Sequence, residues 1–125
     1  MSAGYVRLYA DGDGETHFED VALATRERTA ASGARAAVAA AIPVEGLIFR
    51  AVLDDGDSES PHNAPYPVFI ITLAGEAEVT VSDGERRVFG PGSVVLVEDT
   101  TGRGHVTRPL GHGPRLTLLA PAGAP

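Results

Sequence analysis

The chain has 125 residues, 43% of them hydrophobic, and a formal net charge of −7. This length supplies one hydrophobic core, so we expect residues 1–125 to form a single domain. The negative charge argues against a nucleic-acid partner, because phosphates require a basic surface. No apolar run approaches the roughly 20 residues of a membrane span, and the chain carries no secretory signal pattern. We therefore expect no membrane partner and a cytoplasmic location.

Missing residue types limit the chemistry further. The sequence has no cysteine, which excludes disulfides, thiolate ligands and a thiol nucleophile. All ten basic residues are arginine, so no lysine is present to form a Schiff base. Ser93 follows Gly-Pro-Gly but does not sit in a nucleophile elbow, and the glycine clusters lack the pattern of a phosphate loop.

The first half of the chain is predicted to consist of strands, turns and loops. In chain order these are an edge strand Tyr5–Ala10, a turn Asp11–Gly14, a strand Thr16–Ala24, a loop or short helical turn Arg26–Arg35, an extended segment Ala34–Ala41, a strand Gly46–Leu53 and an acidic loop Asp54–Ser60.

The second half has clearer strand signals. An apolar run of strand length is followed by alternating residues, an Asp-Gly hairpin signal and a Gly-Pro-Gly turn. The predicted strands are Val68–Ala74, Ala77–Ser82, Glu85–Phe89, Val94–Val97 and Arg115–Leu119. Many short strands with Gly and Pro turns indicate an all-β fold, either an antiparallel sandwich or a barrel.

Two stretches have the spacing of a metal-binding barrel motif. Gly56 is followed by His62 and then by Gly75, and a later segment runs from Gly92 to His105. This spacing resembles the two signature motifs of the cupin superfamily. Three runs resemble, more specifically, a group of small single-domain bacterial cupins, namely DGDGETHFEDV from Asp11, HNAP from His62 and GPGSVVLVEDTTGRGH from Gly90.

The resemblance implies a cupin-type antiparallel jelly-roll β-barrel with His62 and His105 facing one cavity. It also implies a homodimer, with Tyr5–Ala10 or Thr16–Ala24 at the interface, because an unpaired edge strand needs cover. The chain departs from the cupin pattern at Ala64 and Val68, where further metal ligands would stand.

Two imidazoles in one cavity are able to act as an acid/base pair or to bind a divalent transition metal. Two protein ligands are fewer than a catalytic metal site usually has. A third would have to come from Glu98 or Asp99, in a loop that folds inward. We therefore expect no metal cofactor, with a transition metal bound by His62 and His105 as the alternative.

Other candidate residues lie on the neighbouring segments. Tyr66 has the parity of His62 and would orient or protonate a substrate, unless it belongs to a loop and simply packs. Arg50 interrupts an apolar strand and would anchor an anionic group, unless it faces outward. Val68 and Glu98 complete the expected substrate contacts. His17 and His112 are expected in a surface or interface strand and in a loop.

These features favour an enzyme that converts a small, partly apolar molecule by acid/base chemistry without redox change. A lyase, isomerase, dehydratase or cyclase step of specialised metabolism fits this description. Two alternatives remain open: a non-catalytic binding or sensor domain, and a metal-dependent oxygenase with a reduced ligand set.

Overall fold

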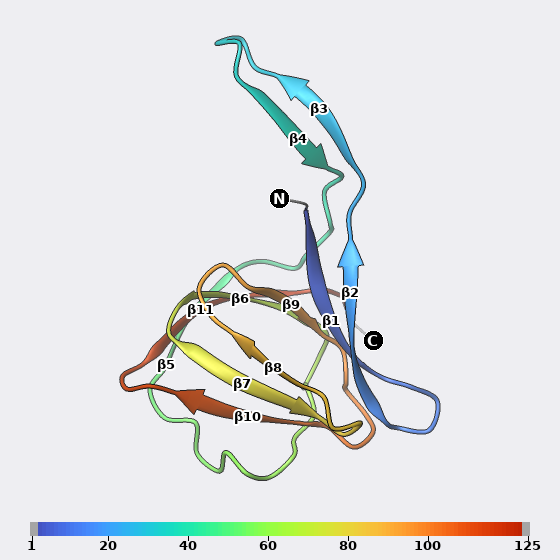
Figure 1. Ribbon diagram of the computed structural model, residues 1–125, viewed down its shortest axis with the longest axis vertical. Helices are drawn as coiled ribbons and strands as arrows, with labels where there is room; N and C mark the ends of the chain where they lie inside the picture. The colour runs from blue at the N-terminus through green and yellow to red at the C-terminus, as the bar shows by residue number, and fades with distance from the viewer. Residues whose placement is uncertain (1–2, 124–125) are drawn as a thin grey trace.

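The computed structural model describes residues 3–123, and all of its regular structure is β-strand (Figure 1). The strands are β1 (Gly4–Ala10), β2 (Thr16–Ala22), β3 (Thr25–Thr29), β4 (Arg35–Ala39), β5 (Ile48–Val52), β6 (Val68–Ala74), β7 (Glu76–Val81), β8 (Arg86–Phe89), β9 (Val94–Val97), β10 (His105–Leu110) and β11 (Arg115–Pro121). The all-β prediction is therefore confirmed.

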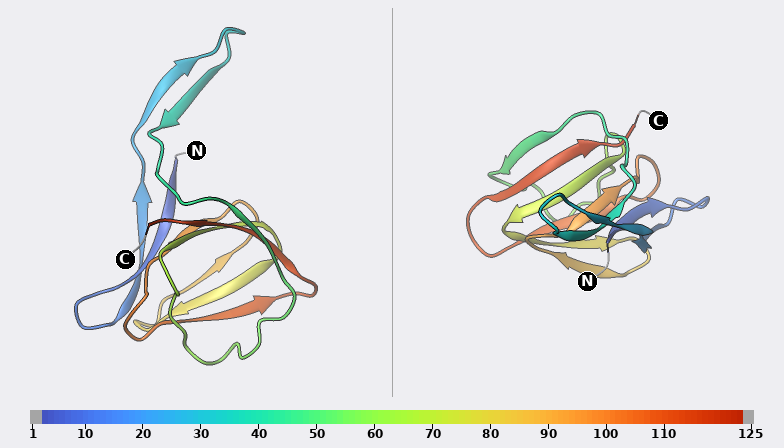
Figure 2. Two further views of the ribbon diagram at one scale, coloured as in Figure 1. Left: turned by 180° about the vertical axis from the view of Figure 1, so that it is seen from behind. Right: turned by 90° about the horizontal axis from the view of Figure 1, so that it is seen from above.

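A six-stranded sheet in the order β2-β1-β9-β6-β11-β5 forms one side of the body, and a three-stranded sheet in the order β10-β7-β8 forms the other (Figures 1 and 2). Alternation along the strands decides which side chains face inward. On β9, Val95 and Val97 are buried, whereas Val94 and Leu96 are only half-buried. The larger sheet therefore presents one apolar face to the interior.

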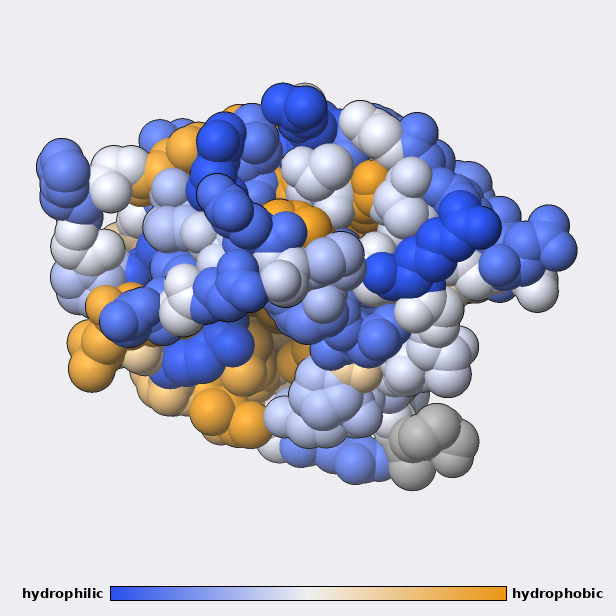
Figure 3. Space-filling model, turned by 90° about the horizontal axis from the view of Figure 1, so that it is seen from below, coloured by the Kyte–Doolittle hydropathy of each residue, from blue (hydrophilic) through white to orange (hydrophobic). Residues whose placement is uncertain are grey.

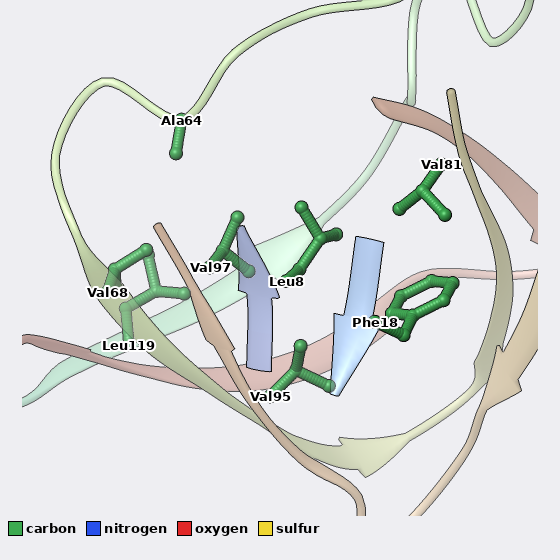
Figure 4. Packing of buried hydrophobic residues seen from close by; sticks show 8 residues of the cluster. All are labelled: Leu8, Phe18, Ala64, Val68, Val81, Val95, Val97 and Leu119. Atoms are coloured by element: carbon green, nitrogen blue, oxygen red, sulfur yellow. The ribbon is translucent and has the colours of Figure 1, made fainter. Parts of the chain in front are cut away.

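The core lies between these two sheets. Its buried hydrophobic cluster consists of Leu8, Phe18, Ala64, Val68, Val81, Val95, Val97 and Leu119 (Figure 4). Burying a valine or leucine side chain contributes about 1.5–3 kcal/mol. This cluster draws on six strands and the segment before β6, so it holds both sheets together.

The strands β3 and β4 form a two-stranded sheet of their own, which projects away from the body (Figures 1 and 2). Every residue of β3 is exposed, and so is every residue of β4 except the half-buried Ala39. The prediction of a loop or helical turn over Arg26–Arg35 was therefore wrong where β3 lies, although residues 30–34 do form the turn of the hairpin. The segment lacks an apolar strand pattern because both faces of this hairpin are exposed.

Three further differences from the sequence prediction concern strand pairing and one missing strand. Tyr5–Ala10 is not an edge strand, because β1 lies between β2 and β9. The pairing is also not antiparallel throughout, since β1 runs parallel to β9. The strand β10 was not predicted, and its Pro109 and the glycines around it weaken the strand signal.

Other predicted elements are confirmed. The strand predicted at Val68–Ala74 has the same bounds as β6, and the Asp83-Gly84 hairpin joins β7 to β8. Within residues 3–123 no helix has the length and apolar character that crossing a bilayer would require.

Candidate functional site

A cavity of about 430 Å³ lies between the two larger sheets. This volume is within the range of small-molecule sites. The residues around it are Leu8, Arg50, Val52, Asp54, Asp55, Asp57, His62, Ile70, Thr72, Ala77, Val79, Phe89, Val95, Val97, His105, Thr107, Arg115 and Thr117. The cavity wall thus combines apolar side chains with charged ones.

His62 and His105 both line this cavity, although 42 residues lie between them in the chain. Their backbones form an isolated β-bridge with two hydrogen bonds of 3.0 Å each. Their imidazole rings lie edge to face, with centroids 4.5 Å apart. The bridge therefore fixes the two rings as neighbours.

Gly104 makes this close approach possible. Its φ is +76°, and a Cβ atom there would lie 2.5 Å from the carbonyl oxygen of His62. Only glycine tolerates both conditions. On the other side, the buried Thr16 hydroxyl donates to the carbonyl of Gly104 at 2.8 Å. The loop before His105 is thus held between β2 and His62.

Asp99 orients His105 from behind the cavity. Its side chain has no exposed surface, and Oδ2 lies 2.6 Å from Nδ1 of His105. A carboxylate is a hydrogen-bond acceptor, so it places the imidazole proton on Nδ1 and leaves Nε2 with a free lone pair. The other carboxylate oxygen, Oδ1, is buried without a hydrogen-bond partner among residues 3–123.

His62 has a different environment. His62 keeps exposed surface, but partial desolvation at the cavity wall lowers its pKa, and the neighbouring His105 lowers this pKa further. A hydrogen bond with the backbone of Ser60 and the charge of Asp99 oppose this effect. Of these two imidazoles, only that of His105 is hydrogen-bonded to a carboxylate.

Two arginines line the cavity, Arg50 on β5 and Arg115 on β11. Nε of Arg50 donates to the hydroxyl of Thr117 at 3.1 Å, and no ion pair holds Arg50 within the described part of the chain. Burial lowers the pKa of Arg50, with Arg115 adding to the effect. Arg50 nevertheless keeps exposed surface.

Arg115 is already paired. Its Nη1 lies 2.7 Å from Oδ2 of Asp55, and both side chains are largely buried. Gly75 leaves room for it, since a Cβ at that position would lie 2.8 Å from Cγ of Arg115. Asp55 neutralises Arg115 and leaves Arg50 as the cation that is free to meet an anion.

Three predicted site residues lie outside this cavity. Tyr66 is half-buried and packs against the core cluster, in a non-strand segment. Val68 is buried in the core. Glu98 faces the opposite side of β9 and pairs with Arg7. Of the predicted residues, the structure brings together His62, His105 and Arg50.

From the sequence, Asp99 was predicted only as a conditional metal ligand, and its contact with His105 was not predicted. The alternation of inward and outward residues along β9 could have predicted that Asp99 points inward, because Asp99 continues the buried positions Val95 and Val97 while Glu98 does not. Arg115 was also missed as a cavity residue. It shares the parity of Thr117, which lies opposite Arg50 in the sheet.

The two remaining histidines lie elsewhere. His17, on β2, lies between Asp11 and Asp83, at 2.7 and 2.8 Å. His112 is exposed in the loop between β10 and β11.

Metal binding would have to rely on the two cavity imidazoles. Among residues 3–123, no group of three or more His, Cys, Asp or Glu side chains is arranged to hold a metal ion. The Nδ1 atom of His105 already faces Asp99, so only Nε2 of that ring is free to face a ligand. Searches against protein-family models and against curated proteins find no match for this chain.

Proposed function

We propose that the chain is a single-domain cupin with a jelly-roll barrel, and that its cavity converts a small anionic organic molecule by acid/base chemistry. A lyase, isomerase, dehydratase or cyclase step has this character. The observation that carries the proposal is the juxtaposition of the Asp99-supported His105 with His62 and an unpaired Arg50 around one cavity.

His105 is the general base in this scheme. With the proton held on Nδ1 by Asp99, Nε2 is free to accept a proton from a carbon or oxygen of the substrate. The resulting imidazolium is stabilised by the buried carboxylate beside it. Groups of this kind contribute about 10²–10⁴-fold to a rate.

His62 is neutral at neutral pH, since its pKa is lowered. A neutral imidazole donates one hydrogen bond, and a proton that it gains is readily given back. Its ring is the neighbour of His105, so it is placed to polarise a substrate oxygen or to return a proton to a second atom.

Arg50 supplies the anchor. A guanidinium binds a carboxylate or an enolate through two parallel N–H donors. Only its Nε is used by Thr117, so its terminal N–H groups are available to a ligand. The apolar wall at Leu8, Ile70 and Phe89 would hold the hydrocarbon part of the same molecule.

A panel of cyclic and aromatic carboxylic acids tests this function through the melting temperature. A ligand at 100 times its dissociation constant stabilises the native state by about 2.7 kcal/mol. Stabilisation should be seen with acids, be lost in Arg50→Met and persist in Arg86→Met, an exposed arginine on β8. Acids that stabilise both variants equally would contradict the anchor.

Metal analysis of untagged protein addresses the oxygenase alternative. We expect well under one equivalent of transition metal and an unchanged fold in chelator. Stoichiometric metal that is lost in both His62→Ala and His105→Gln would replace the acid/base proposal with a metal-dependent one.

A further inference from the structure

A row of three side chains crosses the cavity face of the six-stranded sheet. The register pairs Thr117 of β11 with Arg50 of β5 on one side and with Thr72 of β6 on the other. All three residues line the cavity. Residues directly opposite one another lie side by side, on strands about 4.8 Å apart. The proposed anchor Arg50 therefore stands two strands away from Thr72, with Thr117 between them.

The guanidinium of Arg50 lies along this row. Its Nε donates to the hydroxyl of Thr117 at 3.1 Å, so the head group extends from β5 over β11, in the direction of β6. The Thr117 hydroxyl donates its own proton to the carbonyl of Arg50 at 3.5 Å, and it has no second proton to offer a ligand. A carboxylate bound to the terminal N–H groups of Arg50 would thus have Thr72 as its nearest free hydroxyl in the row.

Thr72 carries a hydroxyl that the fold does not use. The residue is 7% exposed, and its backbone is engaged with the turn before β9. Its N–H donates to the carbonyl of Ser93 at 3.1 Å, and its carbonyl accepts from Gly92 at 2.9 Å. Within residues 3–123 the Thr72 hydroxyl has no hydrogen-bond partner, unlike that of Thr117. Since buried polar groups are normally hydrogen-bonded, a free hydroxyl on a cavity wall is suited to a polar atom of a ligand.

Apolar side chains form the next row on the same face. Ile70 of β6 pairs with Leu119 of β11 on one side and with Val95 of β9 on the other. Ile70 and Val95 line the cavity, and Phe89 lines it from the facing sheet. The two rows are neighbours, because residues two apart along a strand share a face. The wall therefore suits a molecule with oxygen atoms at one end and hydrocarbon at the other.

The remaining charges of the cavity oppose a second anionic group. Arg115 is already paired with Asp55, and the carboxylates of Asp54 and Asp57 also line the cavity. The loop that carries these aspartates is the green segment at the bottom of Figure 1, and the view from that side shows mostly hydrophilic residues (Figure 3). Like charges brought together are unfavourable, so a second carboxylate would be repelled. The oxygen that meets Thr72 is therefore a neutral one, in a hydroxyl or a carbonyl group.

We propose that the cavity selects a hydroxy or oxo monocarboxylic acid with an apolar remainder, and that Thr72 recognises the hydroxyl or carbonyl oxygen. This assignment rests on the proposed function, because Arg50 holds the carboxylate in both. The recognised oxygen stands one or two carbons from the carboxylate, since Thr72 and Arg50 belong to the same row. Thr72 is thus a specificity-determining residue, and it distinguishes such acids from their deoxy analogues.

Matched acids test the assignment by titration calorimetry on the full-length protein. The probes are hydrocinnamate and its α-hydroxy, β-hydroxy and α-oxo derivatives, which share one carboxylate and one apolar ring. At least one oxygenated acid should bind the wild type about tenfold more tightly than hydrocinnamate, as expected for one hydrogen bond to a buried group. In Thr72→Val, which keeps the shape of the side chain, this ratio should fall to about one, while hydrocinnamate binds as before. Thr80→Val is the matched control and should keep the ratio, because Thr80 alternates with the inward-facing Val79 and Val81.

Thermal melts give a second readout that needs no ligand. Thr72→Val should melt at or above the temperature of the wild type, because the hydroxyl that it removes has no partner in the described part of the chain. Thr117→Val should melt lower, because it removes the acceptor of Arg50. A Thr72→Val variant that melts clearly lower would show that the hydroxyl serves the fold, and it would overturn the assignment.

The same titrations distinguish a wrong anchor from a wrong role for Thr72. Acids whose binding is lost in Arg50→Met, but whose oxygen brings no advantage or keeps its advantage in Thr72→Val, would refute the role of Thr72 and leave the anchor in place. Acids that bind equally well to the wild type and Arg50→Met, or to neither, would refute the proposed function and this assignment with it.

Discussion

Oδ2 of Asp99 lies 2.6 Å from Nδ1 of His105, and Asp99 has no exposed surface. This contact joins the end of β9 to the start of β10 across six positions of the chain. It gives His105 a fixed ring orientation that His62 lacks.

The first prediction concerns the tautomer of His105. Nitrogen-15 NMR of the wild type should place the proton on Nδ1, because the carboxylate accepts from that atom. In Asp99→Leu the acceptor is gone, and the proton should move largely to Nε2, with the His62 signal little changed. A wild-type His105 that carries its proton on Nε2 would contradict the geometry proposed for catalysis.

The second prediction is an asymmetry in stability. His105→Ala should lower the free energy of unfolding by about 1–3 kcal/mol, because it leaves the buried Asp99 side chain without its hydrogen-bond partner. Asp99→Leu, which removes that buried polar group, should cost far less. Urea unfolding measures both. His62→Ala is the control for loss of an imidazole, and it should be nearly neutral because the His62 side chain is exposed to the open cavity.

The third prediction separates backbone strain from close contact. Gly104→Ala should destabilise the protein more than Gly84→Ala. Both positions have positive φ, at +76° and +98°, but only at Gly104 would the new Cβ meet another atom, the carbonyl oxygen of His62. The shared strain costs about 1–3 kcal/mol, and the contact adds to it at Gly104. Equal losses in thermal melts would show that the bridge has room to shift.

Sequence patterns predicted the interior strands better than the exposed ones. The strand β6 is an apolar run ending at Gly75, and burial explains its pattern directly. The hairpin β3–β4 gave no such signal, since neither of its faces is buried in this chain. Pairing of β1 with β9 also lies beyond local patterns, because it joins strands about 90 positions apart.

The candidate site was predicted in part for similar reasons. Motif spacing pointed to His62 and His105, and strand parity to Arg50. The contact of Asp99 with His105 was not predicted, although Asp99 continues the buried alternation of Val95 and Val97 beyond the end of β9. Tyr66 failed as a cavity residue because its segment, between two prolines, does not continue the strand.

The fourth prediction is a pH dependence that arises at His17. Hydrogen bonds with Asp11 and then Asp83 raise the pKa of His17. Stabilisation by the charged ring is complete below about pH 6.5, the ordinary His value, and is lost as the pH rises through the raised value. The pKa of Asp11 is lowered, chiefly by its hydrogen bond with His17. The stabilisation that the Asp11 carboxylate contributes is therefore lost only on acidification below about pH 4.

The melting temperature of the wild type should therefore exceed that of His17→Gln at pH 5 to 6, and the difference should shrink at pH 8 and above. Comparing the two proteins isolates His17 from other groups, including His62. His112→Gln, in an exposed loop, is the matched control and should follow the wild type at every pH. A difference that is constant with pH would mean that the His17 charge does not stabilise the fold.

Deuterium exchange tests acid/base catalysis in the cavity without knowledge of the full reaction. A carboxylic acid that binds through Arg50 and carries a C–H next to a carbonyl is incubated with the protein in D₂O and followed by proton NMR. We expect exchange well above the buffer rate, reduced by about 10²–10⁴-fold in His105→Gln while binding is retained. Bound ligand that exchanges no faster than in buffer, or equally fast with both proteins, would contradict acid/base catalysis and leave a binding domain.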